Sequence, residues 1–147
     1  MIYLLRHGEA ERGGGDDAAR RLTGEGERQS QVAGRALATL GARIDTCLTS
    51  PKVRAAETAR LACAALEVEP EAAGELREGD FDSLALAAGR GETMLVGHNP
   101  YFADEIARLT GAKAKLRKGG LAIVDGGTLV ALLRPDELTA IAASHAA

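Results

Sequence analysis

The sequence predicts a three-layer α/β/α sandwich around a mostly parallel sheet that ends in a C-terminal hairpin. Two observations lead to this prediction. Short apolar segments alternate with longer segments in which apolar residues recur at helical spacing, an order typical of α/β folds. Near the C-terminus, the apolar segments 121–124 and 128–133 are separated by the glycine-rich turn 125–127, which predicts a hairpin. We expect residues 1–147 to form a single domain.

The first half of the chain has clear element boundaries. The apolar run 2–5 predicts a buried strand, and the polar, glycine-rich segment 9–19 predicts a surface loop. Thr23 is a suitable N-cap for a helix that we expect to end at Gly41. A second strand is expected over 45–49.

The helix that follows this second strand is expected to start sharply. Ser50 is a suitable N-cap and Pro51 a suitable first helical residue, in a helix that runs to about Leu66.

The second half is less regular. The acidic segment 67–91 shows no clear pattern apart from a short helix at 84–88, and 93–96 predicts another strand. Asn99 and Pro100 predict the cap and first residue of the next helix. A basic connection over 111–118 precedes the hairpin. A last helix is expected over 138–143, followed by a loose tail that contains His145.

Composition excludes several classes of function. The net charge is −3, which does not favour nucleic-acid binding, and no basic block indicates an anionic membrane surface. No apolar run is long enough to span a bilayer, and the N-terminus lacks a signal-peptide pattern. Cys47 and Cys63 lack metal-like spacing and are expected to be buried thiols of a cytoplasmic, monomeric protein.

Three unusual clusters each follow a predicted strand. They are Arg6, His7 and Gly8; the segment 50–54, which contains Arg54; and the segment 97–100, which contains His98. If these strands are parallel neighbours, the clusters meet at one edge of the sheet, where ligands of open α/β sheets bind. Two arginines, two histidines and two helix N-termini would then converge, which predicts a site for a doubly charged anion of phosphate size.

These residues resemble the signature of the histidine phosphatase superfamily, which has the phosphoglycerate-mutase-like fold. The Arg-His-Gly motif corresponds to residues 6–8, the second family arginine to Arg54 and the second histidine to His98. The segment 20–26 also resembles the family, and Arg20 falls where small members place another phosphate contact. The resemblance spans residues 1 to about 133, and the short chain resembles the SixA-type phosphohistidine phosphatases most closely.

The resemblance implies a covalent mechanism without a metal ion or cofactor. His7 would attack phosphorus through one ring nitrogen, while the other keeps a proton that is held by a backbone carbonyl. Arg6, Gly8, Arg20 and Arg54 would bind the phosphate. His98 would donate to its oxygens in the transition state.

The leaving group decides whether a general acid is needed. An alkoxide needs a proton, which commonly contributes about 10²–10⁴-fold in rate, whereas the imidazole of phosphohistidine can already be protonated. In the larger family members the acid is a glutamate two residues after a leucine. Glu78 falls at this position, but Asp82 stands where these larger members usually have a glycine. SixA-like members lack the glutamate and have a Gly-Asp pair nearby, which Gly79 and Asp80 resemble. The acid could therefore be Glu78 or Asp80.

The expected substrate is phosphohistidine in a protein, such as a histidine-containing phosphotransfer protein. The alternatives are a phosphatase for small phosphomonoesters and a non-catalytic phosphate-binding module. Several residues also have a purely structural interpretation: Arg20 as a solvated side chain, Ser50 as a cap and Thr58 as a core residue. We expect the basic connection 113–118 to be solvated rather than a docking patch for an acidic partner.

Overall fold

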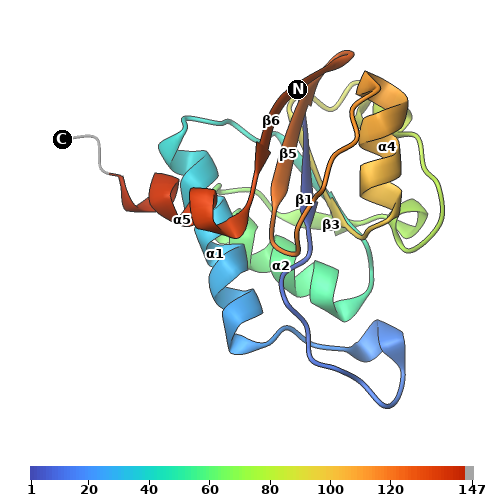
Figure 1. Cartoon of the computed structure of the whole chain (residues 1–147), viewed down its shortest axis with the longest axis vertical. Coiled ribbons are helices and arrows are strands. Elements are labelled where there is room, and N and C mark those ends of the chain that lie inside the picture. Colours follow the sequence, from blue (N-terminus) through green and yellow to red (C-terminus); the bar gives the residue numbers. More distant parts are fainter. Residues whose placement is uncertain (145–147) are drawn as a thin grey trace.

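A computed structural model describes residues 1–144 of the chain and contains one six-stranded sheet. His145, in the predicted tail, lies outside the described residues. The strands lie in the order β3-β2-β4-β1-β5-β6 (Figure 1). Their bounds are β1 Ile2–Arg6, β2 Thr46–Thr49, β3 Pro70–Ala72, β4 Thr93–Gly97, β5 Leu121–Asp125 and β6 Thr128–Leu133.

The sheet is mostly parallel, as the sequence predicts. Strands β1, β4, β2 and β3 are parallel, whereas β5 is antiparallel to β1 and forms the C-terminal hairpin with β6. The register pairs Arg6 with Gly97 and Thr49 with Val96. The carboxyl ends of β1, β2 and β4 therefore meet at one edge of the sheet. This confirms the prediction that the three sequence clusters lie at the same edge.

Helices cover both faces of the sheet and complete the three layers (Figure 1). Helices α1 (Gly24–Thr39), α2 (Val53–Ala64) and α5 (Pro135–Ala143) pack together on one face. Helices α3 (Ser83–Ala87) and α4 (Tyr101–Thr110) lie on the other. Single turns of 3₁₀-helix occur at Asp17–Ala19 (η1) and Gly74–Leu76 (η2).

The side chains of β1 show why this chain needs both layers. Tyr3 and Leu5 are buried in the core under α1, α2 and α5, whereas Ile2 and Leu4 are buried in the core under α4. Alternate residues of a strand point to opposite faces, so a strand that is apolar at every position must be covered twice. This burial fixes the register of β1 and hence the position of the residues at its end.

Three predicted helix starts differ from the structure. Helix α2 begins at Val53 with Lys52 as its N-cap, not at Pro51, because the Ser50 side chain is engaged elsewhere. Helix α4 has Pro100 rather than Asn99 as its N-cap. Helix α5 begins at Pro135, three residues earlier than expected, because Glu137 accepts a hydrogen bond from the Arg134 backbone N–H.

Strand β3 lies in the segment 67–91, for which the sequence predicted no strand. It is a short, largely exposed edge strand that exists through its parallel pairing with β2. Within residues 1–144, no helix has the length and hydrophobicity that crossing a membrane requires.

Candidate active site

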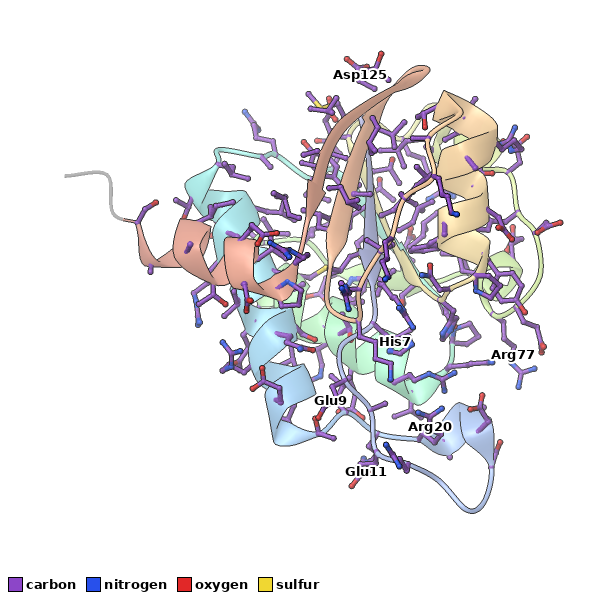
Figure 2. All side chains as sticks on the ribbon, in the orientation of Figure 1. His7, Glu9, Glu11, Arg20, Arg77 and Asp125 are labelled. Carbon is purple, nitrogen blue, oxygen red and sulfur yellow. The ribbon has the colours of Figure 1, made fainter. Side chains whose placement is uncertain are left out.

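The three sequence clusters lie together at the carboxyl edge of the parallel strands. Arg6 ends β1, His98 directly follows β4, and Ser50 directly follows β2. Figure 2 shows His7 at the end of the sheet opposite Asp125, which lies at the tip of the β5–β6 hairpin. The site is therefore built from residues that are distant in sequence and held by adjacent strands.

His7 is buried and has a defined hydrogen-bond partner. Its Nδ1 lies 2.7 Å from the carbonyl oxygen of Gly8, which can only accept, so Nδ1 carries the proton and Nε2 keeps its lone pair. The pKa of His7 is lowered from 6.5 to about 4, chiefly by burial; the Gly8 carbonyl opposes this shift, and the positive charges of Arg54, Arg6 and Lys118 add to it. His7 is thus a neutral imidazole with one nitrogen ready to attack.

Gly8 and Gly26 let the backbone after His7 pack directly against the start of α1. A Cβ on Gly8 would lie 2.6 Å from the Gly26 carbonyl oxygen, and a Cβ on Gly26 would lie 2.0 Å from the Glu9 carbonyl oxygen. The Gly8 N–H also donates to Thr58 Oγ1 at 3.1 Å. These contacts fix the peptide whose carbonyl orients His7.

Arg54 projects from the first turn of α2 and is 6% exposed. Its Nη1 donates to the Asp17 carbonyl oxygen at 2.8 Å, and its Nη2 lies 3.2 Å from Asp17 Oδ2. Thr58, one turn further along α2, donates from Oγ1 to the Arg54 carbonyl oxygen at 2.8 Å. Thr58 therefore joins the Gly8 peptide to the backbone that carries Arg54.

The Asp17 carboxylate connects Arg54 to two further cations. Arg20 Nη1 lies 3.0 Å and Lys52 Nζ 3.3 Å from its oxygens. Hydrogen bonds from Arg20, Lys52 and Arg54 hold the pKa of Asp17 well below its usual range, although the side chain is exposed. Figure 2 shows Arg20 at the same end of the molecule as His7, beside the 3₁₀ turn η1.

His98 lies beside His7, with 5.2 Å between ring centroids and 54° between ring planes. Its Nε2 lies 2.7 Å from Ser50 Oγ, which also accepts a hydrogen bond from the Lys52 backbone N–H at 3.2 Å. Because the buried Ser50 hydroxyl has no other acceptor within the described residues, we assign it as the donor to Nε2, which places the His98 proton on Nδ1. Burial, followed by the charges around it, lowers the pKa of His98 to about 3.

The Arg6 side chain donates a hydrogen bond from Nη1 to the Leu116 carbonyl oxygen at 2.9 Å. Burial lowers the pKa of this guanidinium. Three buried nitrogens of the cluster have no hydrogen-bond partner among residues 1–144: Arg6 Nε, Arg54 Nε and His98 Nδ1. Buried donors are normally paired in proteins. Donors from three different elements around one imidazole form an arrangement suited to the oxygens of an anion.

The two candidate acids are placed differently. Glu78 has a side chain that is 63% exposed and forms an ion pair with Arg77 at 3.7 Å, and Asp80 is also exposed. Neither has a hydrogen bond to His7, Arg6, Arg54 or His98 within the described part of the chain. The structure therefore gathers the histidines and arginines and leaves both carboxylates in the loop after η2.

Sequence reasoning missed the supporting residues of the site. Ser50 was expected to be a cap and Thr58 a core residue, yet both hydroxyls bind parts of the cluster. The helical spacing between Arg54 and Thr58 was the sequence feature that could have indicated a role for Thr58. No sequence feature indicated a role for Asp17 or Lys52, because their contact depends on how the loop 9–19 folds back over α2.

Comparison with known proteins agrees with this geometry. The model of the histidine phosphatase superfamily (branch 1) matches residues 2–96, which include the Arg-His-Gly motif, Arg54 and the strand before His98. The chain belongs to the histidine phosphatase superfamily.

Relatives place the chain with SixA-type members of this superfamily. A phosphohistidine phosphatase SixA homolog of Haemophilus influenzae is 32% identical over 128 residues, which cover 76% of this chain and 78% of that protein. A mitochondrial serine/threonine-protein phosphatase, Pgam5 of Drosophila ananassae, is 39% identical over 70 residues, which cover 48% of this chain but 24% of that protein.

Solved structures confirm the phosphoglycerate-mutase-like fold. A candidate phosphohistidine phosphatase SixA from Agrobacterium tumefaciens matches with a TM-score of 0.80 and 25% identity, covering 91% of this chain and 97% of that one. The protein histidine phosphatase SixA complexed with tungstate matches with a TM-score of 0.81 and 21% identity, covering 93% and 98%. Together the comparisons support a phosphatase that acts on a phosphate-bearing substrate.

Proposed function

We propose that this protein removes phosphate from phosphohistidine in a protein and that it does so through a covalent phosphohistidine on His7. The observation that carries this proposal is the hydrogen bond from His7 Nδ1 to the Gly8 carbonyl. It leaves Nε2 unprotonated, and burial among cations lowers the pKa of the ring, so the nucleophile stays neutral well below pH 7.

In the first step, His7 Nε2 attacks phosphorus as the bond from phosphorus to the substrate nitrogen breaks. Arg6 and Arg54 hold the phosphoryl oxygens, and Nδ1–H of His98 donates to the oxygen that gains charge. Fixed donors of this kind stabilise the transition state without reorganisation. Arg20 reaches the same cluster through Asp17, and displacement of Asp17 by the phosphate would free both arginines to bind it.

In the second step, water attacks the phosphoryl group on His7. The bond between Nε2 and phosphorus breaks, phosphate leaves, and the imidazole returns to its starting protonation state because Nδ1 keeps its proton throughout. The Gly8 carbonyl also stabilises the positive charge that the ring carries while it is phosphorylated. The proposed chemistry needs no metal ion, and we expect a chelator to leave the rate unchanged.

The position of the carboxylates supports this substrate class. An alkyl ester needs a proton donor for its leaving oxygen. Glu78 and Asp80 are exposed and, in the part of the chain that the structure describes, form no hydrogen bond or ion pair with the cluster. A phosphohistidine ring, in contrast, can be protonated on its other nitrogen and leave as neutral imidazole. The similarity to the Haemophilus influenzae SixA homolog supports the same substrate class.

Turnover of a phosphohistidine protein should be compared with turnover of alkyl and aryl phosphates, in the wild type and in Glu78→Gln. The matched control is Glu75→Gln, which removes the same charge from an exposed residue of η2. We expect phosphohistidine to be the best substrate and both variants to match the wild type. Efficient alkyl-ester hydrolysis that Glu78→Gln alone abolishes would favour the small-ester alternative. Binding of tungstate with no turnover of any substrate would favour a non-catalytic binding module.

A further inference from the structure

A basic groove of about 600 Å³ opens next to the candidate active site. Arg6 lines it, and its other cations come from three separate parts of the fold: Arg28 in α1, Arg117 and Lys118 in the connection before β5, and Arg134 at the start of α5. These elements can be followed in Figure 1. A volume of this size exceeds what one phosphate needs and falls in the range of sites that hold larger groups.

The backbone of the basic connection is fixed to the catalytic segment. The Leu116 carbonyl oxygen accepts hydrogen bonds from Arg6 Nη1 at 2.9 Å and from Asn99 Nδ2 at 3.0 Å. The Gly119 N–H donates to the His7 carbonyl oxygen at 2.9 Å. The side chains of Arg117 and Lys118, between these anchors, remain exposed.

Lys118 lies close enough to the reacting group to act on it electrostatically. Its positive charge is one of the causes that lower the pKa of His7. The groove therefore shares Arg6 with the candidate phosphate site, and Lys118 in its lining acts on His7.

The charge of the groove is not balanced within the protein. Its lining contains five cations but two carboxylates, Glu25 and Asp136. Arg28 is paired with Glu25, and Arg134 is paired with Glu137 outside the lining, which leaves Arg6, Arg117 and Lys118 as the cations of the groove without an ion pair among residues 1–144. Within residues 1–144, neither Arg117 nor Lys118 forms an ion pair, and the same holds for Lys113 and Lys115 in the same connection. A protein of net charge −3 thus concentrates unpaired positive charge beside its active site.

We propose that this groove docks the acidic surface that flanks the phosphorylated histidine of a protein substrate. The proposal rests on the function proposed above and adds the chemistry of the partner. Complementary charge steers association and fixes the orientation of a partner, and a bound acidic segment would align the phosphohistidine with His7. The sequence alone favoured a solvated connection at 113–118, but its place on one wall of a groove shared with Arg6 favours docking.

The test uses two phosphohistidine peptides that differ only in flanking residues, Asp and Glu in one and Asn and Gln in the other. Phosphoimidazole, which has no flank, reports on the catalytic site alone. The groove variant is Arg28→Gln with Arg117→Gln. The control is Arg35→Gln with Arg60→Gln, which removes the same charge from exposed helix positions outside the groove.

We expect the wild type to prefer the acidic peptide by about tenfold in kcat/KM at low salt, which corresponds to about 1.4 kcal/mol. The groove variant should lose most of that preference through a higher KM, and added salt should weaken it in the wild type. The control variant should keep the preference, and all three proteins should hydrolyse phosphoimidazole at similar rates.

Equal use of both peptides by the wild type, or a preference that survives in the groove variant, would overturn the docking proposal and leave the phosphohistidine activity intact. Failure of the wild type to hydrolyse phosphoimidazole and both peptides, with turnover of an aryl phosphate, would overturn the proposed function and the docking proposal with it.

Discussion

The protonation of His7 gives the most quantitative test of the site. An exposed imidazole with a pKa near 6.5 would be only about 3% neutral at pH 5. Burial and the charges of Arg54, Arg6 and Lys118 lower the pKa of His7 to about 4. At pH 5 the ring would then be about 90% neutral, so the fraction able to attack phosphorus differs by about 30-fold between the two cases.

The same shift affects stability. Between pH 6.5 and 4 the unfolded chain binds a proton at residue 7 that the folded protein does not bind, so acid favours the unfolded state. The stability is fully present above pH 6.5 and falls as the pH drops towards 4, by up to about 1.4 kcal/mol per pH unit from this residue. The lowered pKa of His98 acts in the same direction.

The assay is the titration of imidazole ¹⁵N resonances between pH 3 and 8. The chain has three histidines, and His7→Asn and His98→Asn assign the resonances. The kcat/KM of an aryl phosphate against pH reports the same ionisation in the free enzyme. Lys118→Gln should raise the pKa of His7, because it removes one of the nearby positive charges. A His7 midpoint near 6.5, unchanged in that variant, would refute the buried, cationic environment described above.

Two further predictions concern residues that support the site. Ser50→Ala should lower kcat/KM by about tenfold and shift the His98 tautomer seen in ¹⁵N spectra, because a fully buried hydrogen bond to Nε2 is lost. An unchanged tautomer and an unchanged rate would show that Ser50 does not position His98. Gly26→Ala should destabilise the fold by about 3 kcal/mol in urea unfolding, since its Cβ would meet the Glu9 carbonyl oxygen. Gly24→Ala, whose Cβ would enter open space, should be neutral or slightly stabilising, and equal losses in the two glycine variants would contradict the close approach at Gly26.

The sequence was sufficient to predict the architecture and the convergence of the site because both follow from contiguous patterns. Apolar runs such as 2–5 and 93–96 are buried on both faces, and the clusters with Arg6, Arg54 and His98 lie directly after or near strand ends. Once these strands are parallel neighbours, their carboxyl ends have to meet.

The supporting contacts could not be predicted because they depend on long-range packing. The hydroxyl of Ser50 forms a hydrogen bond with His98, 48 residues away in the sequence, and α2 begins at Val53 rather than at Pro51. Strand β3 has little intrinsic strand character and forms because β2 offers an unpaired edge. The groove depends on α1, α5 and the basic connection coming together, which no local pattern in residues 113–118 indicates.

The most direct test of the central claim is to trap the covalent intermediate. Enzyme mixed with excess phosphorylated substrate, quenched in alkali within one turnover and digested, can be examined by mass spectrometry at the peptide that contains His7. The mechanism predicts an acid-labile phosphoryl group on His7 that forms and decays at the rate of turnover and is absent from His7→Asn. Turnover that proceeds at the normal rate with His7 never phosphorylated, or with the phosphoryl group on another residue, would contradict it.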